Sequence, residues 1–371
     1  MKKLLRQYRI IQACGLRGVV LCLLIAIALA AGCSACSQPR SPLQAAQPDT
    51  EHGLTAHFID VGQGDSILLE SEGEYALIDA GEFECGQRVL TYLAAVGAES
   101  LRYVIATHPH SDHIGGMRTV IDETKTENFI TVKTDSDNYG WNKLLEDVEM
   151  LEINYIDARA GDTYDLGSST FTIMGPLSDD YEDYNGYSIV IKATCGDISY
   201  LLTGDSNIAN EKEMLEAGED LSADVLKCGH HGSSDSTCTR FLQVVNPAFA
   251  VISCAKDNEY GHPHRETLER LELLGCRYYC TADSGSVVAS TDGKALTIRY
   301  VDSEAEPSGY IAGEPKNADS QLVFVGNQKS MLFHDPVCEG AKSMKEENKV
   351  EFKTYEEAVA AGYKPCASCD P

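Results

Sequence analysis

The stretch Thr107-His108-Pro109-His110-Ser111-Asp112-His113 contains four side chains that can bind metal within six residues. An apolar run at residues 103–107 leads into it, and Gly115-Gly116 follows it. A loop that leaves the end of a strand can point such side chains into one pocket. The two glycines let the backbone turn closely into the next helix. Surface histidines without a metal rarely show this pattern, so the stretch predicts a metal centre.

Two later stretches offer ligands for a second metal. Asp205 follows Leu201-Leu202-Thr203-Gly204, where a carboxylate at a strand end can bridge two cations. His230-His231 follows the run Asp224–Lys227. Taken alone, Asp205 also fits a helix cap, and a histidine pair also fits an ordinary loop. Together with the first stretch, these residues predict a site for two metals.

The apolar pattern around these stretches alternates between strands and helices. Strand-like runs lie at residues 54–60, 66–70, 75–79, 103–107, 188–193, 200–203, 224–227 and 248–253. Helical spacing lies at residues 87–96, 210–217, 237–245 and 265–274. This alternation predicts an α/β fold in which helices cover the sheets.

Longer motifs carry a resemblance to a known family. The HxHxDH stretch, Leu77-Ile78-Asp79-Ala80-Gly81 and Thr203-Gly204-Asp205 resemble the metallo-β-lactamase superfamily. Residues 58–66, 224–233 and 260–264 resemble the soluble domain of the ComEC competence proteins. The resemblance implies an αββα sandwich with the metals at one edge of the sheets. We expect this hydrolase domain to span residues 54–301.

The resemblance also implies roles for individual residues. It assigns the first metal to His108 and His110, the second to Asp112, His113 and His230, and the bridge to Asp205. Asp79 and Ser233 would support these ligands without binding metal. Between Ile114 and Gly204 there is no histidine, so the first metal has fewer protein ligands than in many members of the superfamily; Asn185 and Ser188 stand in that stretch. Two zinc ions are expected, with manganese as the alternative.

Four residues are expected to act on the substrate: Asp112, His231, His262 and His264. Two adjacent cations acidify a water molecule and polarise the scissile group, so no Ser or Cys nucleophile is needed. Asp112 can steer the proton of that water. The histidines suit a phosphate oxyanion, as hydrogen-bond partners or as proton donors to the leaving oxygen. Loop packing is the alternative for each of them, and Lys227 either adds positive charge or points to solvent.

This chemistry favours a phosphodiesterase, with nucleic acid such as DNA as the leading substrate by analogy. The alternatives are a cell-surface phosphoesterase of the phosphorylcholine type, a lactonase or β-lactamase, and a surface DNA-binding lipoprotein without activity. The net charge of −27, from 30 basic and 57 acidic residues, repels polyanions at long range. Nucleic acid would therefore have to be held by the metals or by a local basic patch.

The N-terminus is typical of an export signal. Residues 1–32 are basic and then apolar, and the apolar run 18–31 has 14 residues where a membrane span needs roughly 20. Leu29-Ala30-Ala31-Gly32-Cys33 resembles a lipoprotein cleavage site. This predicts a lipid on Cys33, with Cys36 as second candidate and an uncleaved anchor as the alternative, and a tether at residues 33–53. The body would lie on the outer face of the cytoplasmic membrane or be secreted. Export permits disulfides among the 14 cysteines, but their pairing stays open.

The C-terminal residues form a separate small module. Residues 302–322 are polar and indicate a linker, and residues 323–371 follow as the module. His-x3-Cys and a later Cys-x2-Cys predict a closed structural zinc site; its ligands would be His334, Cys338, Cys366 and Cys369. A disulfide or free thiols at the last two cysteines are the alternative. Val325-Gly326-Asn327, Phe333 and residues 361–366 resemble the zinc domain of the Ada DNA-repair protein. His334 stands where Ada has its methyl-accepting cysteine, so alkyl transfer is not expected.

Overall fold

The computed structural model describes residues 53–134, 136–303 and 305–369. The expected signal segment, both candidate lipidation sites and the tether up to residue 52 lie outside these residues. Among the described residues, no helix is both long enough and apolar enough to cross a membrane.

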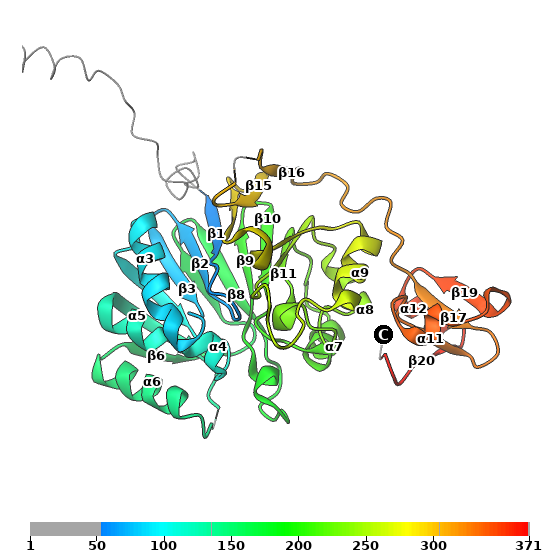
Figure 1. Ribbon diagram of the computed structural model, residues 1–371, viewed down its shortest axis with the longest axis horizontal. Coiled ribbons are helices and arrows are strands. Elements are labelled where there is room, and N and C mark those ends of the chain that lie inside the picture. The colour runs from blue at the N-terminus through cyan, green and yellow to red at the C-terminus, as the bar shows by residue number, and fades with distance from the viewer. Residues whose placement is uncertain (1–52, 135, 304, 370–371) are drawn as a thin grey trace, which may run out of the picture. The chain divides into compact units, whose positions relative to one another are not determined.

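Two β-sheets pack face to face, and helices cover their outer faces (Figure 1). The first sheet has nine strands in the order β16-β15-β14-β1-β2-β3-β4-β5-β6. Their bounds are β1 Leu54–Phe58, β2 Ile67–Ser71, β3 Glu74–Ile78, β4 Ser100–Ile105, β5 Lys125–Thr131, β6 Asn154–Asp157, β14 Val287–Thr291, β15 Ala295–Tyr300 and β16 Ser308–Ile311.

The second sheet has seven strands in the order β13-β12-β11-β10-β9-β8-β7. Their bounds are β7 Thr163–Leu166, β8 Ser169–Gly175, β9 Val190–Cys195, β10 Ile198–Leu202, β11 Val225–Lys227, β12 Phe249–Ile252 and β13 Arg277–Cys280. This arrangement confirms the predicted αββα sandwich.

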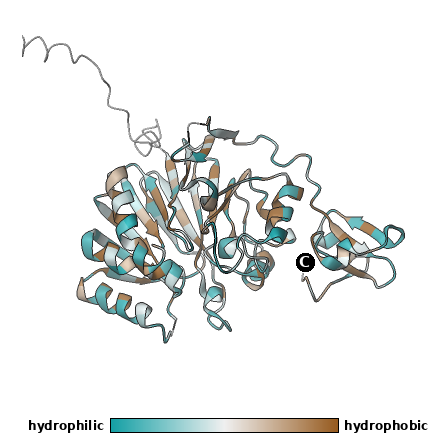
Figure 2. Ribbon diagram, in the orientation of Figure 1, coloured by the Kyte–Doolittle hydropathy of each residue, from teal (hydrophilic) through white to brown (hydrophobic). Residues whose placement is uncertain are grey.

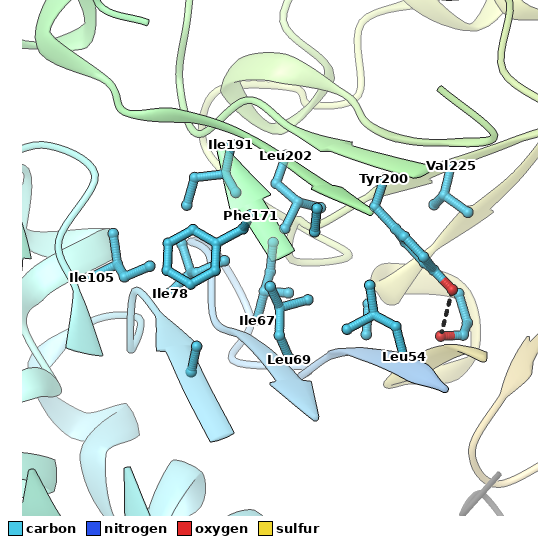
Figure 3. Packing of buried hydrophobic residues seen from close by; sticks show 14 of the residues in the cluster. Leu54, Ile67, Leu69, Ile78, Ile105, Phe171, Ile191, Tyr200, Leu202 and Val225 are labelled. Carbon is cyan, nitrogen blue, oxygen red and sulfur yellow. Dashed lines mark hydrogen bonds between the residues drawn. The ribbon is translucent and has the colours of Figure 1, made fainter. Parts of the chain in front are cut away.

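The main core lies between the two sheets (Figure 3). Alternate residues of each strand face inward, so Ile67 and Leu69 of β2 meet Phe171 and Leu202 from the second sheet. The hydroxyl of Tyr200 crosses the core and donates to the carbonyl of Ala289 at 3.3 Å. Truncating a buried leucine here to alanine is expected to cost about 2–5 kcal/mol, because a cavity would remain.

Helices bury the outer face of each sheet. Helices α3 (Gly86–Val96), α5 (Met117–Glu123) and α6 (Tyr139–Met150) pack on the first sheet through a cluster that includes Val89 and Trp141. Helices α7 (Ile208–Ala217), α8 (Thr239–Val245) and α9 (Arg265–Leu274) cover the second sheet through a cluster that includes Leu242 and Leu271. Figure 2 shows hydrophobic residues gathered on the strands and hydrophilic ones along the outer helices.

Parallel strands determine where the loops with polar motifs meet. Strands β3 to β6 run parallel to one another, and so do β10 to β13. The carboxyl ends of parallel strands lie at the same edge of a sheet, and ligand sites gather there in α/β folds. The loops after β3, β4, β10, β11 and β12 contain nearly all the residues that the sequence singled out for the two-metal site.

The expected linker is partly wrong. Residues 308–311 form β16, which pairs with β15 as the edge strand of the first sheet. Further on, Lys316 donates to Oδ1 of Asp224 at 3.0 Å, and Leu322 is buried. An edge strand can be polar because one of its sides faces solvent, so composition alone suggested a linker here.

The C-terminal module is built on a four-stranded sheet in the order β19-β17-β18-β20. Its elements are β17 Phe324–Asn327, β18 Leu332–His334, α11 Glu339–Lys342, β19 Lys349–Phe352, α12 Tyr355–Ala360 and β20 Lys364–Pro365. Phe324, Phe333, Phe352, Ala358 and Tyr363 form its small core. A Cβ atom on Gly326 would lie 2.5 Å from the ring of Phe352, so this packing requires glycine.

A buried ion pair connects this module to α9. Nε of Arg270 donates to Oδ2 of Asp335 at 2.9 Å, and both side chains are almost fully buried. Thr239 donates to the same carboxylate oxygen at 2.9 Å. Arg270 also donates to the carbonyl of Ser236 at 3.3 Å. A buried charge needs such partners, so these contacts hold the two parts together.

Candidate metal centre

The first histidine pair lies in the loop after β4. His108 is fully buried, and its Nε2 atom lies 3.0 Å from Nδ1 of His110. On the other side of the His108 ring, Nδ1 lies 3.0 Å from the hydroxyl of Thr107 and 3.4 Å from that of Ser188. These contacts fix the ring so that Nε2 points into the site.

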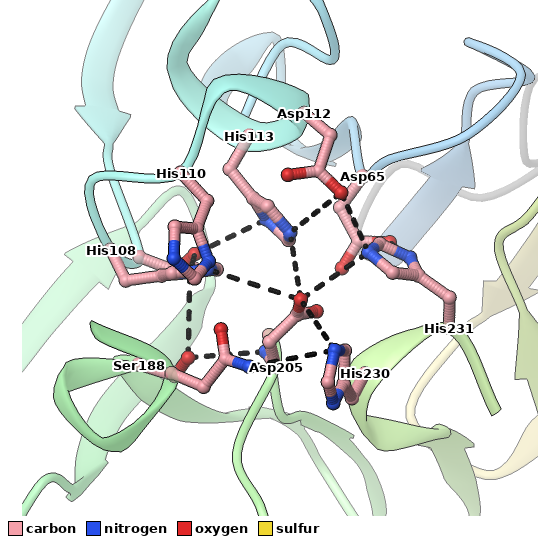
Figure 4. A network of polar contacts seen from close by, with 12 residues as sticks. Asp65, His108, His110, Asp112, His113, Ser188, Asp205, His230 and His231 are labelled. Atoms are coloured by element: carbon pink, nitrogen blue, oxygen red, sulfur yellow. Dashed lines mark hydrogen bonds and ion pairs between the residues drawn. The ribbon is translucent and has the colours of Figure 1, made fainter. Parts of the chain in front are cut away.

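Asp205 lies at the centre of the polar residues, in the loop after β10 (Figure 4). Its Oδ2 atom lies 3.2 Å from Nε2 of His113 and 3.3 Å from Nε2 of His231. The same oxygen lies 3.9 Å from Nε2 of His108. The backbone amide of Asp205 donates to the hydroxyl of Ser188 at 3.1 Å. One carboxylate oxygen is thus surrounded by imidazoles from separate loops.

The donor atoms form two sets that share Asp205. The first set is His108, His110 and Asp205; the second is Asp112, His113, Asp205 and His231. Within each set the donor atoms lie within 4.8 Å of one another. The sequence predicted a bridging Asp205 between two such sets, and the geometry is consistent with that role.

Unsatisfied buried atoms test whether cations fit here. Within the described part of the chain, Nε2 of His113, Nε2 of His231 and Oδ1 of Asp205 are buried without a hydrogen-bond partner. Buried polar atoms are normally satisfied, and a cation would satisfy all three. Imidazole and carboxylate donors suit zinc or manganese. The residues therefore fit two divalent metals.

The electrostatics of the site also favour a bound cation. Burial lowers the pKa of His113, but the carboxylates of Asp205, Asp112 and Asp79 outweigh it and raise this pKa well above its usual value. Burial would raise the pKa of Asp205, but His113 and His231 hold it well below its usual range. The carboxylates thus create a strongly negative potential, which a bound cation neutralises.

Asp79 orients His113 and the loop after β4. Its Oδ2 atom lies 2.8 Å from Nδ1 of His113, which turns Nε2 of that ring toward Asp205. Oδ1 of Asp79 accepts from the backbone amide of Thr107 at 2.9 Å, and Oδ2 accepts from the hydroxyl of Thr107 at 2.7 Å. Asp79 has a φ of 57° at the end of β3, and its carboxylate joins the loops after β3 and β4. This is the supporting position that the sequence predicted.

The structure differs from the sequence prediction at His230 and His231. Both have left-handed backbone angles, with φ of 46° and 55°, so their side chains diverge. His231 is buried, with Nδ1 2.9 Å from the carbonyl of Ser253 and Nε2 3.2 Å from Oδ2 of Asp112. His230 remains 24% exposed, and its Nδ1 lies 3.1 Å from Asp235. The geometry therefore places His231 among the ligands and His230 on the wall of the cleft.

A buried ion pair below the ligands was not predicted. Nζ of Lys227, at the end of β11, lies 2.6 Å from Oδ2 of Asp65 and donates to the carbonyl of Gly204 at 3.2 Å. Oδ1 of Asp65 lies 3.6 Å from Nδ1 of His231. Lys227 is thus buried, not exposed to solvent. The signal in the sequence was a lysine at the end of an apolar strand.

A cleft of about 580 Å³ opens above the ligands. Its residues are Gln63, Glu82, His110, Ser111, Asp112, Asn138, Asn185, Asp205, His230, His231, Ala255, Asn258, Glu259, Tyr260 and His262. None of these described lining residues is a lysine or arginine. Tyr260 is 58% exposed, and its ring stacks on that of His262 with 5.6 Å between the ring centroids. The mouth of the cleft is therefore polar, acidic and aromatic.

His262 and His264 separate in the structure. His262 lines the cleft, its Nδ1 atom is buried without a partner among the described residues, and burial beside His231 and His230 lowers its pKa to about 4. His264 instead accepts from the amide of Ser234 at 2.9 Å, and its Nε2 lies 3.1 Å from the carbonyl of Tyr260. Because backbone groups occupy both nitrogens, the predicted substrate role of His264 is wrong.

Ser233 supports the loop that carries His230 and His231. Its carbonyl accepts from the hydroxyl of Thr267 at 2.9 Å and from that of Ser236 at 3.1 Å. The side chain of Ser233 is buried and does not line the described cleft. It therefore holds the loop in place, and it does not face the substrate.

The four predicted ligands of the C-terminal module come together. The donor atoms of His334, Cys338, Cys366 and Cys369 lie within 4.8 Å of one another. Nδ1 of His334 lies 3.7 Å from Sγ of Cys338 and 3.9 Å from Sγ of Cys369. The amide of Gly340 donates to Sγ of Cys338 at 3.3 Å. Three sulfurs and one imidazole fit a closed structural zinc site.

Known protein families match both the large domain and the C-terminal module. Residues 59–256 match the Metallo-beta-lactamase superfamily, and residues 303–371 match the Metal binding domain of Ada. The fold is similar to the metallo-beta-lactamase fold protein YhfI from Bacillus subtilis, at 15% identity and a TM-score of 0.45, over 64% of this chain and 100% of that one.

Two curated relatives are similar to the large domain. ComE operon protein 3 of Bacillus subtilis is 30% identical over 248 residues, which cover 62% of this chain and 32% of that protein. Recombination protein 2 of Haemophilus influenzae is 30% identical over 254 residues, which cover 67% of this chain and 30% of that protein. The chain thus spans about a third of the length of these relatives. With its two metal-binding donor sets and its matched domain, the chain belongs to the metallo-β-lactamase superfamily of metal-dependent hydrolases and carries an Ada-type metal-binding domain.

Proposed function

We propose that this chain is a two-metal phosphodiesterase with nucleic acid as its leading substrate. The observation that carries the proposal is the pair of donor sets sharing Asp205 on the floor of an open cleft. When bound, two divalent cations acidify a water molecule and polarise a phosphate group. Phosphodiesters need this combination because their charge repels an uncatalysed nucleophile.

The protein's own residues orient and hold the reacting groups. Asp205 keeps the two donor sets at a fixed separation, and Asp112 lies at the edge of the second set, where it can accept a proton. His262 presents a neutral imidazole to the cleft. Asp235 holds Nδ1 of His230, which directs its Nε2 atom toward Asp205 at 3.9 Å. These two rings are placed to hydrogen-bond the phosphate oxygens.

The relatives favour nucleic acid among phosphodiesters. One of them is named Recombination protein 2, and a further relative, 28% identical over 244 residues, is the Competence protein ComA of Neisseria gonorrhoeae. The Ada-type domain supports the same choice by analogy. Because the surface is acidic and the described lining of the cleft holds no lysine or arginine, bound metals and the histidines of the cleft would have to bind the phosphate.

The proposal places the enzyme on the outer face of the cytoplasmic membrane, held by a lipid on Cys33. It rests on the sequence pattern at residues 18–33 alone. Cys36 is the second lipidation candidate, and secretion without an anchor is the alternative.

A second candidate is a phosphoesterase of the phosphorylcholine type. The mouth of the cleft carries the carboxylates of Glu82 and Glu259 beside the exposed ring of Tyr260. Carboxylates and an aromatic face recognise a quaternary ammonium group. This combination favours a phosphodiester that carries a quaternary ammonium group over a long polyanion.

One set of assays separates these functions. The purified full-length chain is given bis-p-nitrophenyl phosphate, p-nitrophenyl phosphorylcholine, nitrocefin, and single- and double-stranded DNA, with and without chelator. We expect chelator-sensitive cleavage of the first substrate and of DNA. Preference for the choline ester would support the second candidate, and nitrocefin cleavage alone would overturn both. Activity on none would favour a DNA-binding lipoprotein.

A further inference from the structure

Two cysteines of the large domain bring their sulfur atoms into contact. Sγ of Cys254 lies 3.4 Å from Sγ of Cys280, and both residues are buried. Cys254 follows β12 and Cys280 ends β13, and these neighbouring parallel strands pair Ile252 with Cys280. A disulfide has a sulfur–sulfur distance of about 2.05 Å. In the structure both are free thiols, so forming the bond requires the sulfurs to move closer together.

The backbone holds the two cysteines together without the sulfurs. The amide of Cys254 donates to the hydroxyl of Thr281 at 3.0 Å, and that hydroxyl donates to the carbonyl of Cys254 at 3.1 Å. Thr281 is adjacent to Cys280, so these bonds and the strand pairing fix the distance between the two thiols. Little conformational entropy remains to be lost when they join.

We infer that Cys254 and Cys280 form a disulfide bond in this protein. The oxidant is a thiol disulfide such as oxidised glutathione, or the disulfide of an oxidoreductase. The thiolate of Cys280 attacks it and releases one thiol, and Cys254 then attacks the mixed disulfide and releases the second. Two cysteine protons and two electrons leave, and one disulfide is reduced to two thiols. The expected export would expose the chain to such an oxidant.

The electrostatics of the pair agree with this order of attack. The two thiols share a hydrogen bond in which either sulfur can be the donor, and this contact lowers the pKa of Cys280 and raises that of Cys254. Cys280 is therefore the thiol that ionises first, and the thiolate is the nucleophile in disulfide exchange.

The bond would act on the metal centre through one neighbouring residue. The carbonyl of Ser253, adjacent to Cys254, lies 2.9 Å from Nδ1 of His231. On the other side, Ala255 lines the cleft, and its amide donates to Gln63 at 3.4 Å. A cross-link at Cys254 would therefore restrain the segment that orients a ligand histidine.

Peptide mapping tests the pairing directly. The full-length chain is refolded from denaturant in a glutathione redox buffer, its free thiols are blocked with N-ethylmaleimide, and it is digested with trypsin without reduction. Cleavage places Cys254 in residues 241–256, Cys280 in residues 278–294 and Cys276 in residues 271–277. We expect the first two peptides to be joined and to separate on reduction. Recovery of both with blocked thiols, or joined to other peptides, would overturn the inference.

Thermal unfolding supplies a second measurement. The Cys254→Ala/Cys280→Ala variant is compared with Cys276→Ala, which removes a buried thiol whose sulfur contacts the carbonyl of Arg277. We expect a phosphine reductant to lower the Tm of the wild type and of the control by on the order of 5 °C. The same reductant should leave the double variant unchanged. A full reductant effect in the double variant would place the responsible disulfide elsewhere and contradict the pairing.

Discussion

Nζ of Lys227 lies 2.6 Å from Oδ2 of Asp65, and both side chains are almost completely buried below the metal ligands. Lys227 also donates to the carbonyl of Gly204, directly before Asp205. One buried cation thus joins the loop after β1, which contains Asp65, to the loop after β10, which contains Asp205. The ion pair balances part of the negative charge of the site and fixes the bridging carboxylate.

Removing this lysine should destabilise the protein strongly. Lys227→Met leaves Asp65 buried without its partner, and we expect the free energy of unfolding to fall by about 3–5 kcal/mol. Chemical denaturation of the full-length chain measures it. The control is Lys192→Met, which breaks the ion pair with Asp220, whose side chain is 75% exposed; it should cost about 1 kcal/mol or less. Adding Asp65→Asn to Lys227→Met should restore part of the loss. If the two lysine variants lost the same free energy of unfolding, the buried ion pair would contribute no more to stability than the exposed one.

Replacing the shared carboxylate should remove hydrolysis and spare the C-terminal module. Asp205→Asn eliminates the anionic oxygen that both donor sets share, so we expect at least a ~100-fold loss of kcat. Elemental analysis should find three metals per chain in the wild type and one, the module's zinc, in the variant. Asp220→Asn, at an exposed position, is the control. Full activity of Asp205→Asn would refute the bridging role.

The two adjacent histidines should respond differently. His231→Ala removes a member of the second donor set, so we expect it to lose metal on dialysis. His230→Ala removes a ring on the wall of the cleft, so we expect it to retain both metals of the large domain and to show lower turnover. Metal content measured beside kcat distinguishes the two variants. Loss of metal from His230→Ala alone would reinstate the ligand assignment that the sequence suggested.

The zinc of the C-terminal module should be separable from catalysis. Cys338→Ser removes one of four ligands, and we expect it to lose one zinc and to lower the thermal stability of the module. Hydrolysis of bis-p-nitrophenyl phosphate should remain within about twofold of the wild type, since the module contributes no residue to the described lining of the cleft. Complete loss of hydrolysis in a folded variant would contradict this separation.

The contact between the module and α9 should contribute to stability. Asp335→Asn leaves the buried guanidinium of Arg270 without its carboxylate, and we expect a loss of about 3 kcal/mol. Glu356→Gln is the matched control, because its ion pair with Arg240 is exposed and is worth about 1 kcal/mol or less. The comparison is made by denaturation with the zinc bound in both variants. If the two cost the same, the buried contact does not hold the module.

Local patterns in the sequence predicted an α/β fold with helix-covered sheets and most of the donor atoms, and the family resemblance implied the sandwich. His108, His110, Asp112 and His113 lie so close along the chain that any loop at a strand end brings them together. The strand-like runs expected at residues 54–60, 66–70 and 200–203 overlap the observed strands 54–58, 67–71 and 198–202, because apolar residues predominate in them. By contrast, residues 308–311 have the composition of a linker but form β16, since a polar edge strand is recognised only by its partner.

By itself, the sequence determined the fold class, the two kinds of metal-binding donor set and the shared role expected of Asp205, because hydrophobic periodicity and ligand spacing are local properties. Only the tertiary structure shows which of two adjacent histidines lies within a donor set, because backbone φ angles of 46° and 55° direct His230 and His231 apart. It also decided that Lys227 meets Asp65 and that Cys254 meets Cys280. Contacts of this kind depend on the order of strands in a sheet, which no short stretch of chain contains.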